Sequence, residues 1–448
     1  MLPSAADWDF RPGPCSLWPM RVLMTSTGYP GHLLPLVPFA RACSRAGHDL
    51  RVAAPRTSAA VVEGLGFALT PLPDPSPQAL RALLSVAGEL PRRLGHEHLM
   101  ASGFGDLATR TALPSLVELA WRFGPDVIVR ESHEFAGALA AELHGIPHVR
   151  VALGLSSTEN ELVRLAAGAV DAQRGTLGLP ADPHGVRLRA APTLSLTPPI
   201  LETATSEPAP GTHRFRSPTS PVRPLPDWWM GGGDPLVYMT FGSAAPGLGF
   251  YPDLYRVAAE ALGGLDARVL LTVGGADPTA LGPLPRNVHV ERWVPQERVL
   301  PHAAAVVCHG GYGSTLGALA HGVPVLALPL FGADQWTNAR RLAGVGAGIA
   351  LLGDDDERRM FTGPGPEVVA AIEDAVTRLI AEARYASGAR LVATDMALLA
   401  PVEQAASTLA AIASTGASRS QARSQAGSGN GSRASGTRSS GAARRSFP

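Results

Sequence analysis

Residues 303–321 contain three consecutive features that restrict how this chain can fold: an apolar run, a glycine cluster and a stretch of helical composition. A short apolar run from Ala303 to Cys308 is followed by a cluster of glycines and then by the helical composition of Leu316 to His321. This order predicts a buried strand, a glycine-rich turn and a helix. Glycine lets the backbone approach a ligand closely, and the N–H groups and dipole at a helix start favour an anion. A tight turn without a ligand is the alternative for the glycine cluster alone.

A second unit of the same kind follows immediately. Gly322 and Pro324 flank Val323, where another apolar run opens, and it ends in a polar loop that contains Asp334 and Gln335. In open parallel sheets, ligands bind outside the carboxyl ends of strands, so both loops are expected to face one crevice. A carboxylate and an amide suit vicinal hydroxyls, and neither is needed merely to close a loop.

The ordered motif HGGxGST, followed by GxP and then DQ, resembles the donor-site signature of the inverting, nucleotide-sugar-dependent glycosyltransferases of the GT-B fold, especially the bacterial antibiotic glycosyltransferases. The resemblance implies an α/β protein with two facing Rossmann-like domains and a cleft between them. It implies that the glycine loop and its polar neighbours contact the diphosphate and that the DQ pair contacts the sugar hydroxyls. The donor-binding residues of these motifs are His309, Gly310, Gly311, Gly313, Ser314, Thr315, Asp334 and Gln335.

Composition agrees with two domains and excludes some partners. The chain has 448 residues, 45% of them hydrophobic, which is enough for two cores. Its 38 basic and 38 acidic residues balance, so no global field indicates nucleic acid or an anionic membrane. Three widely spaced cysteines, Cys15, Cys43 and Cys308, argue against a disulfide framework or metal cluster. This cysteine usage indicates a reduced, cytoplasmic protein, and without an apolar stretch of the ~20 residues that span a bilayer we expect it to be soluble.

The sequence divides at changes of composition. Residues 1–19 lack a basic start and an apolar core, so they do not resemble a signal peptide. The region around 207–235 is rich in proline and glycine, which predicts a linker. After Gly416 the chain is mostly Ser, Gly, Ala and Arg and is expected to be disordered. The expected divisions are an extension 1–19, an acceptor domain 20–206, a linker 207–235, a donor domain 236–390, a returning C-terminal helix 391–415 and a tail 416–448.

Short apolar runs alternate with helical stretches in both halves, as in doubly wound sheets. The predicted strands are Arg21–Thr25, Asp49–Ala54, Asp126–Val129, His148–Ala152, Leu236–Thr240, Arg268–Thr272, Val288–Glu291, Ala305–Cys308, Val323–Leu328 and Gly348–Leu352. Helices are predicted at Leu33–Ala46, Leu107–Phe123 and Glu134–Leu143, and from Pro366 to Ala413 with an interruption near Ser387-Gly388.

His32 lies between the first predicted strand and the first predicted helix, at the carboxyl end of the sheet. The phrase Gly31-His32-Leu33-Leu34-Pro35 is similar to the family's N-terminal signature, and this resemblance implies that His32 is the general base. Such a base needs a carboxylate partner. Relatives carry Asp after the fourth strand, whereas Glu131 lines up here. His133 and Glu134 are alternatives, and Glu131 could instead pair with a surface arginine.

Further donor contacts are expected in two loops. Ser243 follows the strand Leu236–Thr240 and can bond a phosphate, while Gly242 allows close approach. The motif Trp293-Val294-Pro295-Gln296 resembles the one in which the Trp stacks on the nucleobase and the Gln lies alongside; a core position for the Trp is the alternative.

Gly317 stands where UDP-sugar-dependent plant relatives have a Glu that binds the ribose hydroxyls, which favours dTDP-sugars over UDP-sugars. No metal motif is present, so neither a metal nor another cofactor is expected. The sequence therefore predicts a metal-independent, monomeric or homodimeric enzyme that moves a sugar, expected to be a deoxysugar, from a nucleotide diphosphate to a hydroxyl of a small lipophilic acceptor such as a polyketide. A non-catalytic GT-B partner and a nucleotide-sugar epimerase are the alternatives.

Overall fold

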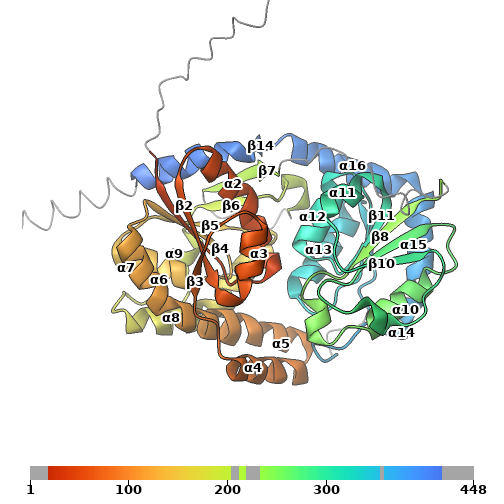
Figure 1. The fold of residues 1–448 in the computed structure, drawn as a ribbon, viewed down its shortest axis with the longest axis horizontal. Coiled ribbons are helices and arrows are strands. Elements are labelled where there is room, and N and C mark those ends of the chain that lie inside the picture. The colour runs from red at the N-terminus through yellow and green to blue at the C-terminus, as the bar shows by residue number, and fades with distance from the viewer. Residues whose placement is uncertain (1–18, 203–210, 218–232, 354–357, 416–448) are drawn as a thin grey trace, which may run out of the picture.

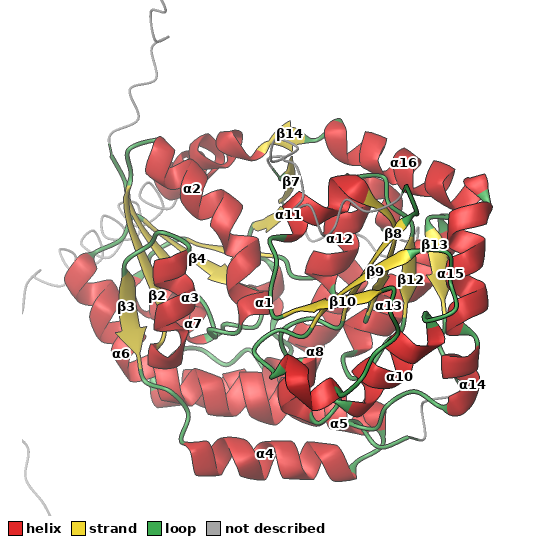
Figure 2. Ribbon diagram, turned by 45° about the vertical axis from the view of Figure 1, so that its right-hand side comes forward, coloured by secondary structure: helices red, strands yellow, loops and turns green. Residues whose placement is uncertain are grey.

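The computed structural model describes residues 19–202, 211–217, 233–353 and 358–415. They form two α/β domains side by side, each built on a parallel sheet with helices on both faces (Figure 1, Figure 2). The prediction of two facing Rossmann-like domains is confirmed. Residues 1–18, the tail 416–448 and most of the expected linker lie outside the described residues.

The N-terminal sheet has eight strands, and every neighbouring pair in it is parallel. The strand β4 (Val127–Glu131) is buried on both faces because helices cover both sides of the sheet. Its first three residues are therefore all apolar. In spatial order the strands are β14 (Ala400–Pro401), β7 (Thr212–Arg216), β6 (Thr193–Ser195), β5 (His148–Val151), β4 (Val127–Glu131), β1 (Arg21–Thr25), β2 (Asp49–Pro55) and β3 (Leu69–Leu72).

The second sheet has six parallel strands. In both sheets the first strand of the domain pairs with the second on one side and with the fourth on the other, so the chain reverses direction across the sheet at β1/β4 and at β8/β11. Ligands of such sheets bind at these points. The spatial order is β10 (Val288–Glu291), β9 (Arg268–Thr272), β8 (Leu236–Thr240), β11 (Ala303–Cys308), β12 (Val325–Ala327) and β13 (Gly348–Ala350).

The helices connect the strands and cover the sheets. None of the described helices is both long enough and apolar enough to cross a bilayer. The first domain contains α1 (Pro30–Leu33), α2 (Val37–Arg45), α3 (Ala59–Gly64), α4 (Pro77–Glu89), α5 (Arg92–His98), a π-helical segment (Leu99–Ala108), α6 (Thr109–Phe123), α7 (Ala136–His144), α8 (Ser156–Thr176) and α9 (Val186–Arg189). The second contains α10 (Asp253–Ala261), α11 (Gln296–Val299), α12 (Tyr312–Ala320), α13 (Ala333–Gly344), α14 (Pro366–Ala370), α15 (Ile372–Ala381) and α16 (Ala383–Ala397).

Two expectations about the helical C-terminal region were wrong. The break lies at Glu382, between α15 and α16, and not at Ser387-Gly388. Gly388 is inside α16 because the helix packs so closely on the backbone of Gly346 that a Cβ atom at 388 would overlap its carbonyl oxygen. The expected single returning helix is also interrupted, by β14 and a short 3₁₀ turn, before helical residues 405–415.

The C-terminal segment and part of the expected linker belong to the first domain. β7 lies inside the range 207–235, yet it pairs in parallel with β6, so this part of the range is a strand of the sheet. β14 then pairs with β7 and extends the sheet further. Figure 1 shows the C-terminal helices running along the top of both domains, from α16 over the second domain to residues 405–415 beside α2.

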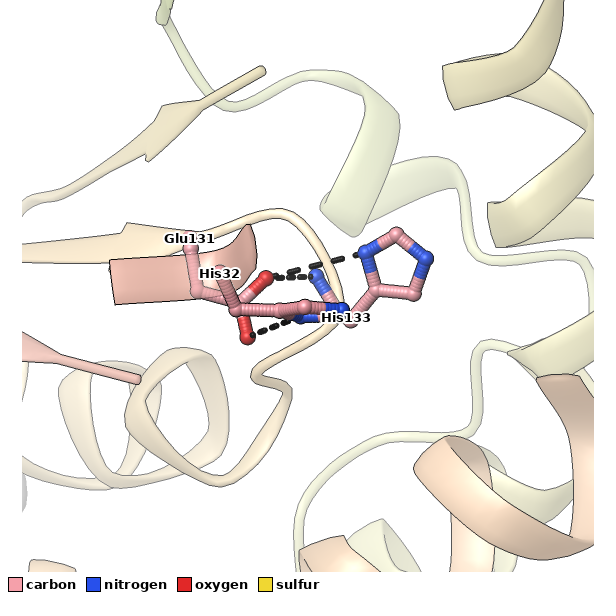
Figure 3. Close-up of side chains that lie close together, drawn as sticks. All are labelled: His32, Glu131 and His133. Carbon is pink, nitrogen blue, oxygen red and sulfur yellow. Dashed lines mark hydrogen bonds and ion pairs between the residues drawn. The ribbon is translucent and has the colours of Figure 1, made fainter. Parts of the chain in front are cut away.

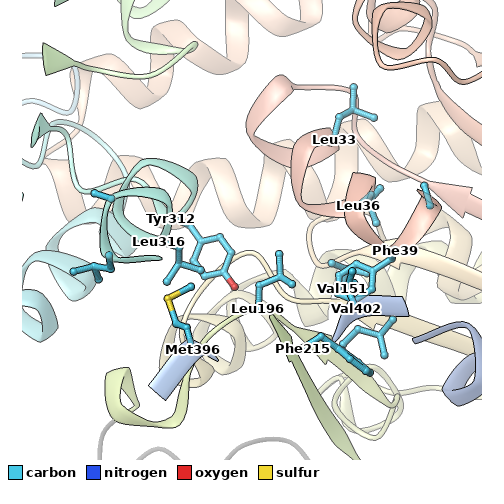
Figure 4. Close-up of a cluster of buried hydrophobic side chains, with 14 of the residues drawn as sticks. Leu33, Leu36, Phe39, Val151, Leu196, Phe215, Tyr312, Leu316, Met396 and Val402 are labelled. Atoms are coloured by element: carbon cyan, nitrogen blue, oxygen red, sulfur yellow. The ribbon is translucent and has the colours of Figure 1, made fainter. Parts of the chain in front are cut away.

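One hydrophobic core passes from one domain into the other. Tyr312 and Leu316 of α12 and Met396 of α16 belong to the same buried cluster as Leu196 and Phe215 of the first domain (Figure 4). The Tyr312 hydroxyl also exchanges a hydrogen bond of 3.0 Å with the hydroxyl of Thr197. The helix that begins at the glycine-rich loop is therefore packed directly against the first domain.

A second contact between the domains lies where α4 meets α5. Pro91 forms an antiparallel bridge with Arg359, and the Arg92 N–H donates to the Arg358 carbonyl at 2.8 Å. The Arg92 guanidinium also lies 4.5 Å from the ring centre of Trp336 on α13. Figure 2 shows α4 and α5 beneath the two sheets, so these helices reach the second domain from below.

Candidate active site

His32 and Glu131 come together where the direction of the first sheet reverses. β1 ends at Thr25, and His32 follows it in the single turn of α1; Glu131 is the last residue of the neighbouring strand β4. The two residues are far apart in sequence, but β1 and β4 are paired, so their carboxyl ends are adjacent. His32 Nδ1 lies 3.1 Å from Glu131 Oε1. The expected carboxylate partner of His32 is therefore Glu131, in spite of its extra methylene.

The Glu131 carboxylate is completely buried, and both of its oxygens are held. Oε1 accepts the backbone N–H of Thr27 at 3.2 Å and its hydroxyl at 2.8 Å, while Oε2 accepts the backbone N–H of His133 at 2.6 Å. Burial acts to raise the pKa of Glu131, but the charge of His32 and the hydrogen bonds from His133 and His32 outweigh it, so the pKa lies well below its ordinary value. Glu131 is an anion at neutral pH.

This arrangement determines which nitrogen of His32 is available for chemistry. Thr27 Oγ1 lies 3.0 Å from the same Nδ1 atom, and its hydroxyl hydrogen is donated to Glu131. The His32 Nδ1–H is therefore the donor, and it faces Thr27 Oγ1 and Glu131 Oε1. The other nitrogen, Nε2, then carries the lone pair. An imidazole with a buried carboxylate behind it is the arrangement of a general base.

Aromatic rings line the other side of His32. Phe104 stacks on the imidazole with ring centres 5.3 Å apart, and Tyr29 and His133 lie 5.7 and 4.7 Å away. Phe104 comes from the π-helical segment, a form that often occurs at functional sites. Sequence reasoning missed Phe104, because an apolar residue inside a helical stretch carries no local sign of facing a site. Thr27 was missed too, although its place between strand and helix is such a sign.

Glu134, one of the alternatives for the carboxylate partner, has a different task. Its two oxygens accept the backbone N–H of Gly137 at 2.9 and 3.0 Å, and the Thr25 hydroxyl also donates to it. Burial raises its pKa. Glu134 therefore satisfies the start of α7 and does not contact His32.

The glycine-rich loop differs in one detail from the expectation. Only Gly310 and Gly311 lie in the turn after β11; α12 begins at Tyr312, so Gly313, Ser314 and Thr315 form its first turn. The helix starts before the expected Leu316. Gly311 has an extended backbone and stands at the N-cap position, so the first helical turn follows it directly. Ser314 and Thr315 are nearly buried, whereas Gly313 is exposed.

Two glycines make room for His309. A Cβ atom at Gly242 would lie 2.7 Å from His309 Cε1, and one at Gly311 would overlap the same ring. Burial lowers the pKa of His309 to about 4, so its imidazole is neutral at pH 7. Its buried Nδ1 has no hydrogen-bond partner among the described residues. A buried polar atom of this kind requires an explanation, and a bound ligand is one.

Gln335 does close a loop, contrary to the expectation. Its side-chain oxygen accepts the backbone N–H groups of Leu330 and Phe331 at 2.8 and 3.2 Å, which holds the turn between β12 and α13. One turn further along α13, the Asn338 amide donates to the Gly310 carbonyl at 2.9 Å. The helix that carries the DQ pair therefore also fixes the glycine loop.

Asp334 lies in the first turn of α13, in the second domain. It is half-buried, and burial raises its pKa, while the charges of His133 and His32 act in the opposite direction. The start of α13 also borders the first domain. The Ala333 N–H next to Asp334 lies 3.5 Å from His96 Nδ1 on α5.

The remaining predicted donor residues are spread around the end of the second sheet. Trp293 is 72% exposed in the loop after β10, so it is not a core residue, whereas Val294 is buried. Gln296 begins α11, and a Cβ atom at Gly317 would lie 3.5 Å from its side-chain oxygen. Ser243 is exposed in the turn after β8.

Within the described part of the chain, one group of side chains has the spacing of metal ligands. Ligand atoms of His32, Glu131 and His133 all lie within 4.8 Å of one another. The carboxylate already accepts hydrogen bonds from Thr27 and from the His133 backbone, and the Nδ1 atoms of both histidines are turned to it. Hydrogen bonding therefore accounts for this group as it stands.

The chain resembles known proteins in both sequence and fold. Residues 256–411 match the family described as "Erythromycin biosynthesis protein CIII-like, C-terminal domain". The L-demethylnoviosyl transferase of Streptomyces niveus is 34% identical over 361 residues, which cover 78% of this chain and 91% of that enzyme. The elloramycin glycosyltransferase ElmGT of Streptomyces olivaceus is 33% identical over 413 residues, with 86% and 96% covered.

Among solved structures, the glycosyltransferase SsfS6 of Streptomyces sp. SF2575, complexed with thymidine diphosphate, superposes with a TM-score of 0.68. It is 25% identical, and the match covers 87% of this chain and 99% of SsfS6. The chain therefore belongs to the antibiotic glycosyltransferases of the GT-B fold, enzymes that move a sugar from a nucleotide diphosphate to a natural-product acceptor.

Proposed function

We propose that this enzyme transfers a deoxysugar from thymidine diphosphate to a hydroxyl group of a lipophilic natural product, with inversion at the anomeric carbon and with His32 as the general base. The observation that carries the proposal is the contact of 3.1 Å between His32 and the buried Glu131, at the end of the sheet that faces Asp334. The thymidine diphosphate bound to the structural relative supports the choice of donor.

In the proposed reaction, His32 Nε2 accepts the proton of the acceptor hydroxyl. The acceptor oxygen forms a bond to the anomeric carbon, and the bond from that carbon to the diphosphate oxygen breaks. One displacement from the face opposite the leaving group inverts the carbon. The imidazolium that forms lies beside the Glu131 anion, which stabilises its charge and fixes the ring.

The second domain holds the donor. The amides of Gly310 and Gly311 and the first turn of α12 offer N–H groups to the diphosphate, where negative charge increases as the sugar departs. His309 is neutral and so contributes a hydrogen-bond donor and no charge. The proposal also assigns to the diphosphate the hydroxyls of Ser314 and Thr315, in the first turn of α12, and of Ser243, in the turn after β8.

The sugar and the base of the donor are assigned to the neighbouring loops. Asp334 and the amide nitrogen of Gln335 face the sugar hydroxyls in this proposal; the Gln335 oxygen is already used in the loop. The exposed ring of Trp293 is available to stack on the thymine, with Gln296 beside it. Val294 supports this loop from the core.

Gly317 supports a deoxyribose donor. The position lacks any side chain, and a Cβ atom there would already lie 3.3 Å from Leu300 Cδ1, so a longer acidic side chain would need to displace its neighbours. Thermal shift of the purified protein with dTDP, UDP and GDP tests this choice. A ligand at 100 times its dissociation constant stabilises the native state by about 2.7 kcal/mol. A shift with UDP equal to that with dTDP would contradict the assignment.

Product formation tests the reaction itself. We expect dTDP-deoxysugars to be transferred to polyketide-type aglycones, with full activity in EDTA because no step needs a metal. His32→Ala should abolish transfer while the dTDP thermal shift is kept, because His32 belongs to the acceptor domain. Turnover at the wild-type rate in this variant would exclude His32 as the base, and sugar epimers formed without an acceptor would indicate an epimerase.

The proposal also includes a cytoplasmic location, which suits the free cysteines Cys43 and Cys308, and a monomeric or homodimeric state.

A further inference from the structure

The carboxylate behind His32 serves two imidazoles. His133 follows Glu131 by two residues, and its Nδ1 atom lies 3.6 Å from the oxygen Oε2, while His32 lies on Oε1. Figure 3 shows both rings on the same side of the carboxylate. The His133 side chain is 17% exposed, close to the 19% of His32. A second imidazole therefore borders the same site.

His133 is held from behind by a buried polar chain. The Ser132 hydroxyl lies 3.3 Å from His133 Nδ1 and donates to Glu159 Oε1 at 3.1 Å. Glu159 also accepts the Leu153 N–H at 2.9 Å, and its other oxygen lies 3.7 Å from Arg150 Nε. Ser132, Glu159 and Arg150 are all at most 4% exposed. Ser132 and Glu159 Oε1 are hydrogen-bonded in this chain, whereas Glu159 Oε2 meets Arg150 only as an ion pair.

The ring of His133 also packs directly against that of His32. The His133 imidazole stands edge-on to His32 at 4.7 Å and to Phe104 at 4.8 Å, so the three rings form one packed group. The backbone N–H of the same residue provides the shortest hydrogen bond to the Glu131 carboxylate, at 2.6 Å. Glutamate has one more rotatable bond than aspartate, and each of its oxygens needs a partner if the carboxylate is to stay in place.

The charged groups around His133 are mostly anionic. Glu131 of β4 and Glu159 of α8 face it, as does Asp334 of α13 from the second domain; His32 of α1 and His96 of α5 are the basic groups nearby. Burial acts to lower the pKa of His133, but these carboxylates, Glu131 first, outweigh it and raise the pKa above its ordinary value. Protonated His133 would share the negative charge of Glu131 with His32.

We propose that His133 is a positioning residue that acts through Glu131: it holds the second carboxylate oxygen and the His32 ring in place, and it limits how strongly Glu131 favours protonated His32. The inference rests on the proposed role of His32 as the base. In this arrangement the glutamate at 131 and the histidine at 133 form a unit, in which the second imidazole offsets the greater freedom of the longer carboxylate.

Two substitutions separate position from charge. His133→Ala removes the ring, and we expect kcat to fall about ten- to a hundred-fold, the range that a misplaced catalytic group produces, with the acceptor KM within about twofold of wild type. His133→Asn keeps an amide donor near Oε2 and should recover most of kcat. His144→Ala is the control: this histidine is at the far end of α7, where it contacts the Val117 carbonyl. A kcat unchanged in His133→Ala, or a loss that appears only in KM, would overturn the proposal.

The pH profile tests the charge. Asn cannot carry the positive charge of His133, so the acid limb of kcat/KM, where His32 must be deprotonated, should move to higher pH in His133→Asn. An acid limb that stays in place would overturn this part of the proposal.

An NMR titration of the labelled histidine Cε1–H resonances, assigned with His32→Ala, provides the same test without turnover. The His32 resonance should titrate at higher pH in His133→Asn than in the wild type, and an unchanged titration would overturn the coupling. If the wild type transfers no sugar at all, the proposed function fails, while the NMR result still decides on His133.

Discussion

At the scale of single residues, the site depends on how the Glu131 anion is held. Glu131 stands where the resembled family is expected to have an aspartate, which was a reason to consider that the chain is a non-catalytic GT-B protein. The carboxylate nevertheless reaches His32 at 3.1 Å, because Thr27 and the His133 backbone hold it from opposite sides. The extra methylene is thus accommodated within the loops after β1 and β4.

The low pKa of Glu131 makes stability depend on pH. A carboxyl group whose folded pKa is depressed contributes stability above its ordinary value, here 4.5, and this contribution is lost as the pH falls below that value towards the folded pKa. Glu131→Gln should lower the free energy of unfolding by about 1.5 to 3 kcal/mol at pH 7, as expected for lost hydrogen bonds to a charged group. Thermal denaturation of both proteins from pH 7 to pH 4 measures the difference, which should shrink below pH 4.5.

The control for this comparison is Glu118→Gln, since Glu118 pairs with Arg122 on the surface of α6 and is 59% exposed. This variant should match the wild type within about 0.5 kcal/mol throughout. A difference between wild type and Glu131→Gln that stays constant down to pH 4 would show that the Glu131 pKa is not depressed.

At the scale of elements, α13 has a structural task beside its proposed contact with the sugar. Gln335 holds the turn after β12, and Asn338 holds Gly310, so the two loops of the donor site are joined by one helix. The first turn of α12 also packs on the first domain, through the hydrogen bond between Tyr312 and Thr197. These loops are therefore held by helices that are themselves buried.

Gln335→Ala tests this double role. It leaves the N–H groups of Leu330 and Phe331 without their acceptor, so we expect the ligand-free protein to lose about 1 to 3 kcal/mol of stability, and dTDP-sugar binding to weaken as well. Denaturation of the ligand-free protein is the measurement. Thr337→Ala, on the same helix, should change stability by no more than about 0.5 kcal/mol. If Gln335 only contacted the sugar, the ligand-free protein would be as stable as the wild type.

At the scale of the whole molecule, the domains are joined by packing and by backbone-directed hydrogen bonds. Arg341 of α13 donates to the carbonyls of Leu201, Ile200 and Glu202 at 2.9, 2.9 and 2.8 Å. The Ile200 N–H in turn donates to Asp395 of α16 at 2.9 Å. The segment after β6 is thus clamped between two helices of the other domain, opposite the contact made by α4 and α5.

Arg341→Ala should loosen this clamp. Three carbonyl groups lose their donor, so we expect a loss of about 1 to 3 kcal/mol, faster hydrogen exchange in residues 197–202 and a larger radius of gyration in solution scattering. Arg340→Ala removes the exposed neighbouring arginine and should change none of these quantities. Unchanged exchange in Arg341→Ala would show that Arg341 does not hold this segment in place.

Local sequence determined the strands, the loops at their ends and the family to which the chain belongs. The strands β1, β8, β9 and β10 have the predicted bounds. For β1, β8 and β9 the reason is that buried strands in parallel sheets need apolar runs that glycines and polar residues delimit, whereas β10 is a partly exposed edge strand. The sequence did not predict elements with weaker local signals. β7 lies in a proline-rich region, and Gly388 is inside a helix because of a packing contact that no neighbouring residue reveals.

Only the tertiary structure decided how the site is assembled. Glu131 was selected over Glu134 by the pairing of β4 with β1, and Phe104, Thr27 and the ring of His133 joined His32 through contacts between separate elements. The start of α13, next to Asp334, contacts His96 of the first domain. The physical reason is that local pattern specifies how each segment folds, whereas the distances between side chains far apart in sequence depend on which strands pair and how the two domains pack.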